Sequence, residues 1–269
     1  MSQTLNETSL NQEIKESLGQ IYPVEDVYCN VAELRIHYQV SGALDKPPLI
    51  LIHGIGGKLN WWHENMPMFS KFYRTYALDL PGFGRSKRLS GRFTINRGAD
   101  FVKSWLDLIG LKKAHLVAHS MGGQIAARLA AKHPEMLEKL VLVAPNGIPL
   151  SFKDWSSYVS KVPKVKVPLN QTISIAIGTM RTDMLALGQS IYAIFNDSEV
   201  EETLRKVVTP TLVIWGTADS VLPPQLGQRT VALMPNARLA LIENGTHSLM
   251  FDQSYVFNRE VLKFLRTED

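Results

Sequence analysis

Eight short apolar runs alternate with segments of helical periodicity along most of this chain, and this alternation limits the folds open to it. From residue 49 onward the runs are almost continuously hydrophobic, which is typical of parallel strands buried on both faces. They cover residues 27–31, 34–40, 49–53, 74–80, 114–119, 139–144, 210–215 and 238–243. Helix-like segments lie at residues 95–109, 121–132, 225–233 and 255–266. The first two runs are close enough for an antiparallel edge hairpin, and the remainder predicts an α/β fold: a mostly parallel eight-stranded sheet with helices on both faces.

The alternation stops between residues 147 and 208. No strand pattern is present there, and Pro163 and Pro168 precede mixed helical segments. An insertion of this length between two strands is more than a plain loop. We expect a small helical cap over the carboxyl ends of the strands, where open α/β sheets bind ligands. The expected parts are an N-terminal extension (1–26), an α/β core (27–146 and 209–269) and the cap (147–208).

Composition excludes several classes of protein. With 45% hydrophobic and 20% charged residues among 269, the chain does not resemble a disordered protein. Cys29 is the only cysteine, so an intrachain disulfide and a thiolate-rich metal site are ruled out. No apolar run approaches the roughly 18 residues of a membrane span, and the polar N-terminus lacks the apolar stretch of a signal peptide. We therefore expect a cytoplasmic protein without stable membrane insertion.

The net charge of +4 is concentrated in the expected cap. Between Ser151 and Thr182 the only acidic residue is Asp154. The basic residues of this segment are Lys153, Lys161, Lys164, Lys166 and Arg181. The simpler interpretation is a solvated face that aids solubility, and the alternative is attraction of anionic substrates or a lipid surface. No nucleic-acid-binding motif accompanies the charge, so no nucleic-acid partner is expected.

The strongest signal for chemistry is the segment AHSMGG at residues 118–123, between an apolar strand and an expected helix. A serine presented on a tight strand-to-helix turn needs small residues two positions away on either side, because larger side chains would collide. Ala118 stands where such turns usually have glycine. We predict that Ser120 is a catalytic nucleophile, and the alternative is a serine that only caps the helix.

A glycine-rich loop, HGIGG at residues 53–57, follows another apolar run. Glycines let backbone N–H groups approach a substrate closely. Such a loop supplies one donor of an oxyanion hole, and the residue after the nucleophile supplies the other. The expected donors are the backbone N–H groups of Ile55 and Met121. We interpret His53 as a structural residue of the loop rather than as the catalytic base.

Two further strand ends carry the partners that a nucleophilic serine needs. Asp219 follows the run at 210–215, and His247 follows the run at 238–243. Ser120, Asp219 and His247 occur in the chain order of one superfamily of serine hydrolases. The alternative is that Asp219 caps a helix and His247 is one of seven ordinary histidines. That alternative requires three strand ends to agree by chance in residue type and order.

From about residue 27 to the C-terminus the chain resembles the α/β-hydrolase superfamily. In addition to the motifs above, DLPGFGRS at residues 79–86 is similar to the turn after the family's fourth strand. VIWG at residues 213–216 precedes the acidic residue, as it does in the family. The resemblance implies that Asp79 and Ser86 shape a turn and take no part in the chemistry.

Two positions depart from the family pattern. Ala118 replaces glycine in the nucleophile turn, which is a tolerated change. Gly245 stands two residues before His247, where many relatives have a glycine immediately before the histidine. The second departure leaves the shape of the histidine loop open.

The serine at position 120 narrows the chemistry that the resemblance implies. Relatives that open epoxides or remove halides have an aspartate there, whereas serine favours acyl transfer. Ser120 would attack the carbonyl, His247 would take its proton and Asp219 would fix the imidazole tautomer. The N–H groups of Ile55 and Met121 would bind the oxyanion, and water would then release the acyl group. This route needs no metal and no organic cofactor.

The expected function is a serine hydrolase that cleaves small-molecule carboxylic esters with an apolar portion. Two alternatives stay open: a cofactor-free carbon–carbon bond hydrolase of ring-cleavage dienoates, and a non-catalytic ligand receptor on the same fold. A lyase or a cofactor-free peroxidase is a weaker candidate. The residues expected to line the substrate pocket are Trp61, Trp62, Phe83, Trp155 and Met184. Acyl preference and oligomeric state are not predicted by the sequence.

Overall fold

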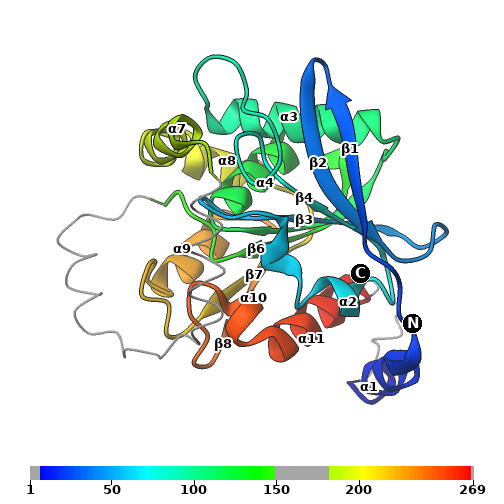
Figure 1. Ribbon diagram of the computed structural model, residues 1–269. Coiled ribbons are helices and arrows are strands. Elements are labelled where there is room, and N and C mark those ends of the chain that lie inside the picture. Colours follow the sequence, from blue (N-terminus) through cyan, green and yellow to red (C-terminus); the bar gives the residue numbers. More distant parts are fainter. Residues whose placement is uncertain (1–6, 149–181, 268–269) are drawn as a thin grey trace.

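A computed structural model describes residues 7–148 and 182–267, and its strands form one eight-stranded sheet (Figure 1). The strands are β1 (Glu25–Val31), β2 (Leu34–Ser41), β3 (Pro48–Ile52), β4 (Arg74–Leu78), β5 (Ala114–His119), β6 (Leu137–Val143), β7 (Thr211–Gly216) and β8 (Ala237–Ile242). Their order across the sheet is β1-β2-β4-β3-β5-β6-β7-β8. β2 pairs antiparallel with β1 and β4, and all later pairs are parallel. The edge hairpin and the parallel core predicted from the sequence are both confirmed.

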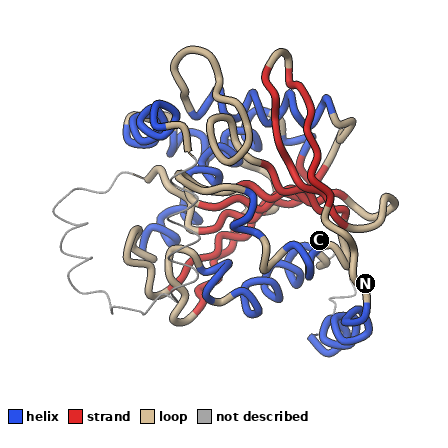
Figure 2. The backbone as a smooth tube through the Cα atoms, viewed as in Figure 1, coloured by secondary structure: helices blue, strands red, loops and turns tan. Residues whose placement is uncertain are grey.

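Helices cover both faces of this sheet (Figure 2). One face carries α3 (Ile95–Leu108), α4 (Met121–Lys132), α7 (Met184–Phe195), α8 (Val200–Lys206) and α9 (Gln225–Leu233). The other carries α1 (Glu7–Glu16), α2 (Met66–Phe69), α10 (Leu249–Asp252) and α11 (Ser254–Leu265). Short 3₁₀ turns are η1 (Ser17–Gly19), η2 (Leu59–Trp62) and η3 (Pro134–Met136). The sheet is therefore the middle layer of three.

The central strand β3 explains why the apolar runs are unbroken. Ile50 and Ile52 belong to the apolar cluster under α3 and α4, whereas Leu49 and Leu51 belong to the cluster under α2 and α11. All four side chains are fully buried. Successive residues of a strand point to opposite faces, so a strand covered by helices on both sides needs apolar residues at every position. Each such side chain contributes about 1.5–3 kcal/mol through burial.

The strand β4 ends two residues earlier than the sequence indicates. The N–H of Leu80 donates to Nε2 of the His53 side chain, 3.0 Å away, and not to a neighbouring strand. A side chain of the glycine-rich loop thus takes the place of a ladder partner and turns the chain away from the sheet.

Some expected features lie partly or wholly outside the described residues. Of the expected cap at residues 147–208, the described part contains α7 and α8, while Trp155 and the basic segment between Ser151 and Arg181 lie outside it. The N-terminal extension, for which no element was expected, contributes α1, whose Leu10 packs against the α11 side of the core. None of the helices in the described ranges has the length and hydrophobicity that a membrane span requires.

Candidate active site

Ser120 lies in the turn between β5 and α4 with a backbone that is unusual for a serine. Its φ is 52° and its ψ is −117°. A non-glycine residue at positive φ costs on the order of 1–3 kcal/mol and persists only where its surroundings hold it. Here the N–H of Ser120 donates to the carbonyl of Val143, and its own carbonyl accepts from the N–H groups of Gln124 and Asn146. The turn is therefore fixed from β6 as well as from α4.

The glycines after the serine are required by close packing. A Cβ atom at Gly122 would lie 2.5 Å from the carbonyl oxygen of His53. At Gly123 it would lie 3.0 Å from the Cβ of Pro145. The sequence signal of small residues near Ser120 thus has a direct steric cause: the loop after β3 and the loop after β6 both press against the start of α4.

His247 and Asp219 meet Ser120 at the carboxyl edge of the sheet. Nε2 of His247 lies 3.2 Å from Oγ of Ser120, and Nδ1 of His247 lies 2.8 Å from Oδ2 of Asp219. Asp219 is fully buried, while the His247 ring is partly open to solvent. The other carboxylate oxygen of Asp219 accepts the N–H groups of Val221 and Leu222, each at 2.8 Å. The three residues that the sequence singled out are therefore in contact, in the order serine, histidine, aspartate.

The loops after β7 and β8 interlock, which accounts for the unusual position of Gly245. Its carbonyl oxygen accepts the N–H of Ala218 at 2.9 Å. The same oxygen would lie 2.1 Å from a Cβ at Gly216. Such a close approach of two main chains is possible because position 216 has no side chain. The loops that carry Asp219 and His247 are thus joined backbone to backbone.

The glycine-rich loop after β3 packs directly on the turn that carries Ser120. A Cβ at Gly54 would lie 2.8 Å from Nδ1 of His119 and 3.0 Å from the Cβ of Ser120. Ile55 follows Gly54, and Met121 is the first residue of α4, so its N–H has no partner within the helix. The two expected oxyanion donors therefore belong to segments that flank Ser120.

His53 is a structural part of this loop. Its Nδ1 donates to the carbonyl of Gly54 at 2.7 Å, and its Nε2 accepts the N–H of Leu80. Burial lowers the pKa of the His53 imidazole, which favours this neutral form. Both ring nitrogens are used to hold the backbone, in agreement with a structural role.

Asp79 organises the turn that follows β4. Its carboxylate accepts the N–H groups of Leu59 and Arg85 at 2.8 and 2.9 Å and also contacts Nδ1 of His37. The hydroxyl of Ser86 donates to the carbonyl of Asp79. Burial works to lower the pKa of His37, but its hydrogen bonds to Asp79 and Asp26 raise that pKa overall. Asp79 and Ser86 therefore shape a turn, as the resemblance implied.

Two of the expected pocket residues contact histidines of the site. The indole of Trp61 meets the His119 ring edge-on with centroids 5.7 Å apart. The Phe83 ring meets His53 edge-on with centroids 5.5 Å apart. Both aromatic residues are buried next to the loops around Ser120.

The other expected pocket residues have different surroundings. Trp62 is fully buried and packs against Phe257 with ring centroids 6.4 Å apart, so we assign it to the core under α11 and not to the pocket. Met184 begins α7 and is 73% exposed among the described residues. Trp155 lies outside the described residues.

His119 also lies at the site, although the sequence did not single it out. Its Nε2 lies 2.8 Å from the carbonyl oxygen of His247, and the two rings are 4.8 Å apart. The residue before a nucleophilic serine is unrestricted in the turn motif, so nothing in the sequence marked it.

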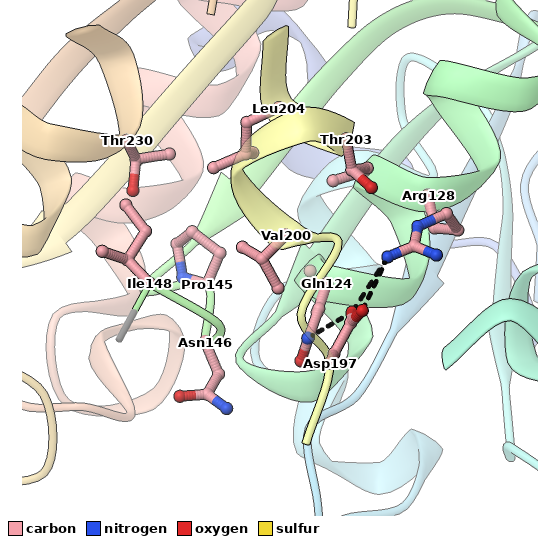
Figure 3. Close-up of a pocket in the computed structure, with 12 residues that line it drawn as sticks. Gln124, Arg128, Pro145, Asn146, Ile148, Asp197, Val200, Thr203, Leu204 and Thr230 are labelled. Atoms are coloured by element: carbon pink, nitrogen blue, oxygen red, sulfur yellow. Dashed lines mark hydrogen bonds and ion pairs between the residues drawn. The ribbon is translucent and has the colours of Figure 1, made fainter. Parts of the chain in front are cut away.

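A small hollow, open to solvent, lies beside the site between α4, α8 and the loop after β6 (Figure 3). Ser120 is not among its lining residues. Arg128 and Gln124 of α4 both bind the carboxylate of Asp197 along one side of the hollow. In the described ranges, no three His, Cys, Asp or Glu side chains are grouped so that they could hold a metal ion.

Comparison with known proteins extends these observations. Residues 47–176 match the family model described as alpha/beta hydrolase fold. A 2-hydroxy-6-oxononadienedioate/2-hydroxy-6-oxononatrienedioate hydrolase of Burkholderia vietnamiensis is 32% identical over 89% of this chain and 95% of its own length. A dihydrolipoyllysine-residue acetyltransferase component of the acetoin cleaving system of Pseudomonas putida is 29% identical over 81% of this chain, and the chain spans 63% of that protein.

A solved structure has a similar fold. The crystal structure of the enol-lactonase from Burkholderia xenovorans LB400 matches with a TM-score of 0.79 at 22% identity, over 89% of this chain and 99% of the enol-lactonase. The sheet order, the serine turn and the relatives agree: this chain belongs to the alpha/beta hydrolase fold family.

Proposed function

We propose that this protein is a serine hydrolase that cleaves small-molecule carboxylic esters with an apolar portion. Ser120 is the nucleophile, His247 the general base and Asp219 the residue that orients the base. The observation that carries the proposal is the line of contacts from Ser120 Oγ to His247 Nε2 and from His247 Nδ1 to Asp219, at 3.2 and 2.8 Å. Nucleophile and base within hydrogen-bond reach, with the base held by a third group, is the arrangement that activates a serine.

Each member of the triad has a distinct task. A neutral His247 with its proton on Nδ1 donates to Asp219 and leaves Nε2 free to take the proton of Ser120. Asp219 is held by the N–H groups of Val221 and Leu222, so it can stabilise the imidazolium without moving. A tetrahedral oxyanion would be bound by backbone N–H groups of Ile55 and Met121, and one such donor contributes about 10²–10³ in rate.

Hydrolysis of the acyl-enzyme uses the same groups in reverse. Water attacks the ester of Ser120 while His247 again acts as base. No metal or organic cofactor takes part in this route. The buried rings of Trp61 and Phe83 next to the site favour a substrate with an apolar portion.

Further parts of the proposal concern the remainder of the chain. A cytoplasmic location, the absence of a nucleic-acid partner and a helical cap formed by residues 147–208 are consistent with the charge and sequence patterns. We expect the basic residues between Ser151 and Thr182 to act on solubility and not on turnover of neutral esters.

A second candidate is hydrolysis of a carbon–carbon bond in a ring-cleavage dienoate. The relative from Burkholderia vietnamiensis, named as a 2-hydroxy-6-oxononadienedioate/2-hydroxy-6-oxononatrienedioate hydrolase, supports this candidate. A third candidate function is a receptor that binds a ligand without turnover. The contacts that join Ser120, His247 and Asp219 argue against it, because ligand binding alone does not require them.

The test combines a fluorophosphonate probe with a panel of p-nitrophenyl esters of increasing acyl length and one dienoate. We expect labelling at Ser120 and ester turnover that falls by several powers of ten in Ser120→Ala, because triad members act as a unit. Ser104→Ala, an exposed serine of α3, is the matched control and should keep both properties.

The panel separates the candidates. Uniformly low ester rates with rapid dienoate turnover would establish the carbon–carbon hydrolase instead. If Ser120 is not labelled and no substrate is turned over, the assignment of Ser120 as nucleophile is refuted and the receptor hypothesis remains.

A further inference from the structure

His119 connects the nucleophile to the main chain of the base. It is the last residue of β5, is bonded directly to Ser120 and is only 1% exposed. Its Nε2 lies 2.8 Å from the carbonyl oxygen of His247. The backbone of Gly54 and the indole of Trp61 enclose the rest of the ring.

The hydrogen bond defines the form of the His119 ring. A carbonyl oxygen can only accept, so Nε2 of His119 carries the proton and donates it to His247. Nδ1 is then unprotonated, and it has no hydrogen-bond partner among the described residues. Burial holds the pKa of His119 well below its usual value, and the neighbouring rings of His247 and His53 lower it further. His119 therefore stays neutral and remains a donor at Nε2.

The histidine loop needs such a connection because of its place in the fold. It follows β8, an edge strand with several partly exposed residues, and His247 stands 127 positions after Ser120 in the chain. Asp219 holds the His247 ring through its side chain, but that contact leaves the main chain of His247 unattached to β5. The bond from His119 supplies the attachment from the residue next to the nucleophile.

We propose that His119 is a positioning residue that fixes the distance between Ser120 and His247 by holding the main-chain carbonyl of the base. The inference rests on the proposed function, in which proton transfer from Ser120 to His247 is a step of the reaction. Displacement of a catalytic group by about 1 Å can reduce the rate by about 10²-fold. Loss of the His119 donor should therefore lower kcat and leave KM almost unchanged.

Three substitutions at position 119 separate positioning from packing. His119→Leu fills the space without a donor. His119→Gln carries an amide nitrogen at the reach of Nε2, whereas His119→Asn carries one at the reach of Nδ1, which faces Gly54. We expect a fall of about 10- to 100-fold in kcat for Leu and Asn, with KM within twofold, and recovery of most of the rate by Gln.

His115→Leu is the matched control. His115 lies four residues earlier on β5, is also buried, and packs against Tyr73 away from the site. This variant should keep the wild-type kcat. If all three variants at position 119 have equal rates, or if His119→Leu is as active as the wild type, the positioning role is wrong.

A spectroscopic measurement tests the same bond without turnover. Long-range ¹H–¹⁵N correlation spectra of the imidazole nitrogens should assign His119 as the neutral tautomer with its proton on Nε2, unchanged between pH 6 and 9. A proton on Nδ1, or titration in this range, would overturn the inference even where a variant fails to fold.

The outcomes distinguish this inference from the proposed function. A wild-type protein that neither hydrolyses esters nor labels at Ser120 refutes the proposed function and the positioning role with it. An active wild type that labels at Ser120, together with a fully active His119→Leu, refutes the positioning role alone.

Discussion

The buried cation on α4 allows a quantitative test of how the segment between α7 and α8 is attached to the core. Arg128 is 4% exposed and makes two hydrogen bonds, of 2.9 and 3.0 Å, to the carboxylate of Asp197 (Figure 3). A third contact reaches Glu199, which is 58% exposed, and a fourth reaches Asn96. The contact with Asp197 is therefore buried, and the contact with Glu199 has solvent on one side.

The two ion pairs should differ greatly in their effect on stability. Arg128→Leu leaves the Asp197 carboxylate, only 9% exposed, without its cation. Removal of one partner of a buried pair costs about 3–5 kcal/mol in the free energy of unfolding. Glu199→Gln should cost less than about 1 kcal/mol, because the exposed charge is hydrated after the pair is broken.

The double variant Arg128→Leu with Asp197→Leu should be more stable than Arg128→Leu alone. Replacement of both charges by apolar groups removes the uncompensated carboxylate, and such exchanges are often close to neutral. The remaining cost is that of the Gln124 amide and the Glu199 N–H, which both lose their partner Asp197, and the buried amide alone accounts for about 1–3 kcal/mol.

Urea unfolding followed by circular dichroism measures all four proteins. Equal losses for Glu199→Gln and Arg128→Leu would refute the argument from burial. A double variant that is less stable than Arg128→Leu would refute the argument that the unpaired charge carries the cost.

The remaining predictions concern the orientation of His247 and the stability of the protein at acid pH. Asp219→Asn should keep the fold but lose about 10⁴ in kcat through the wrong histidine tautomer. Asp107→Asn, at an exposed aspartate of α3, serves as the control. A near-normal rate in Asp219→Asn would mean that another carboxylate orients His247. Burial lowers the pKa of His115 to about 4, whereas the unfolded value is near 6.5. Its contribution to stability is therefore present above about pH 6.5 and is lost as the pH falls towards 4, by on the order of 2–3 kcal/mol. Urea unfolding of His115→Leu across this range should show a shallower loss than the wild type, and parallel curves would contradict the assignment.

Much of the fold could be predicted because each buried strand is almost wholly apolar. β5, α4 and α9 have the predicted bounds, and the other central elements differ by one or two residues. α1 escaped prediction because its few apolar residues, including Leu10, are stabilised by the distant α11 layer and not by local pattern. Long-range packing of this kind leaves little trace in a single sequence.

The candidate site, too, could be predicted only in part from the sequence. The convergence of Ser120, Asp219 and His247 follows from the rule that parallel strands present their carboxyl ends at one edge. The packing around these three residues could not be predicted from that rule. Trp61 and Trp62 are adjacent in sequence, yet Trp61 packs on His119 and Trp62 packs on Phe257. A 3₁₀ turn of four residues, such as η2, has no periodicity from which the direction of either indole could be inferred.

The order in which the strands occur along the chain also has a consequence for biosynthesis. Ser120 is held by β5 and β6, but His247, which we propose as its base, follows only in the loop after β8, 127 residues later. At 5–20 residues per second, a ribosome needs roughly 6–25 s to add that length of chain. During this interval the serine of a nascent chain has the reactivity of an ordinary alcohol, and a chain terminated before β8 never gains more. Under the proposed function, translation products that end before β8 would therefore bind no probe at Ser120 and consume no substrate.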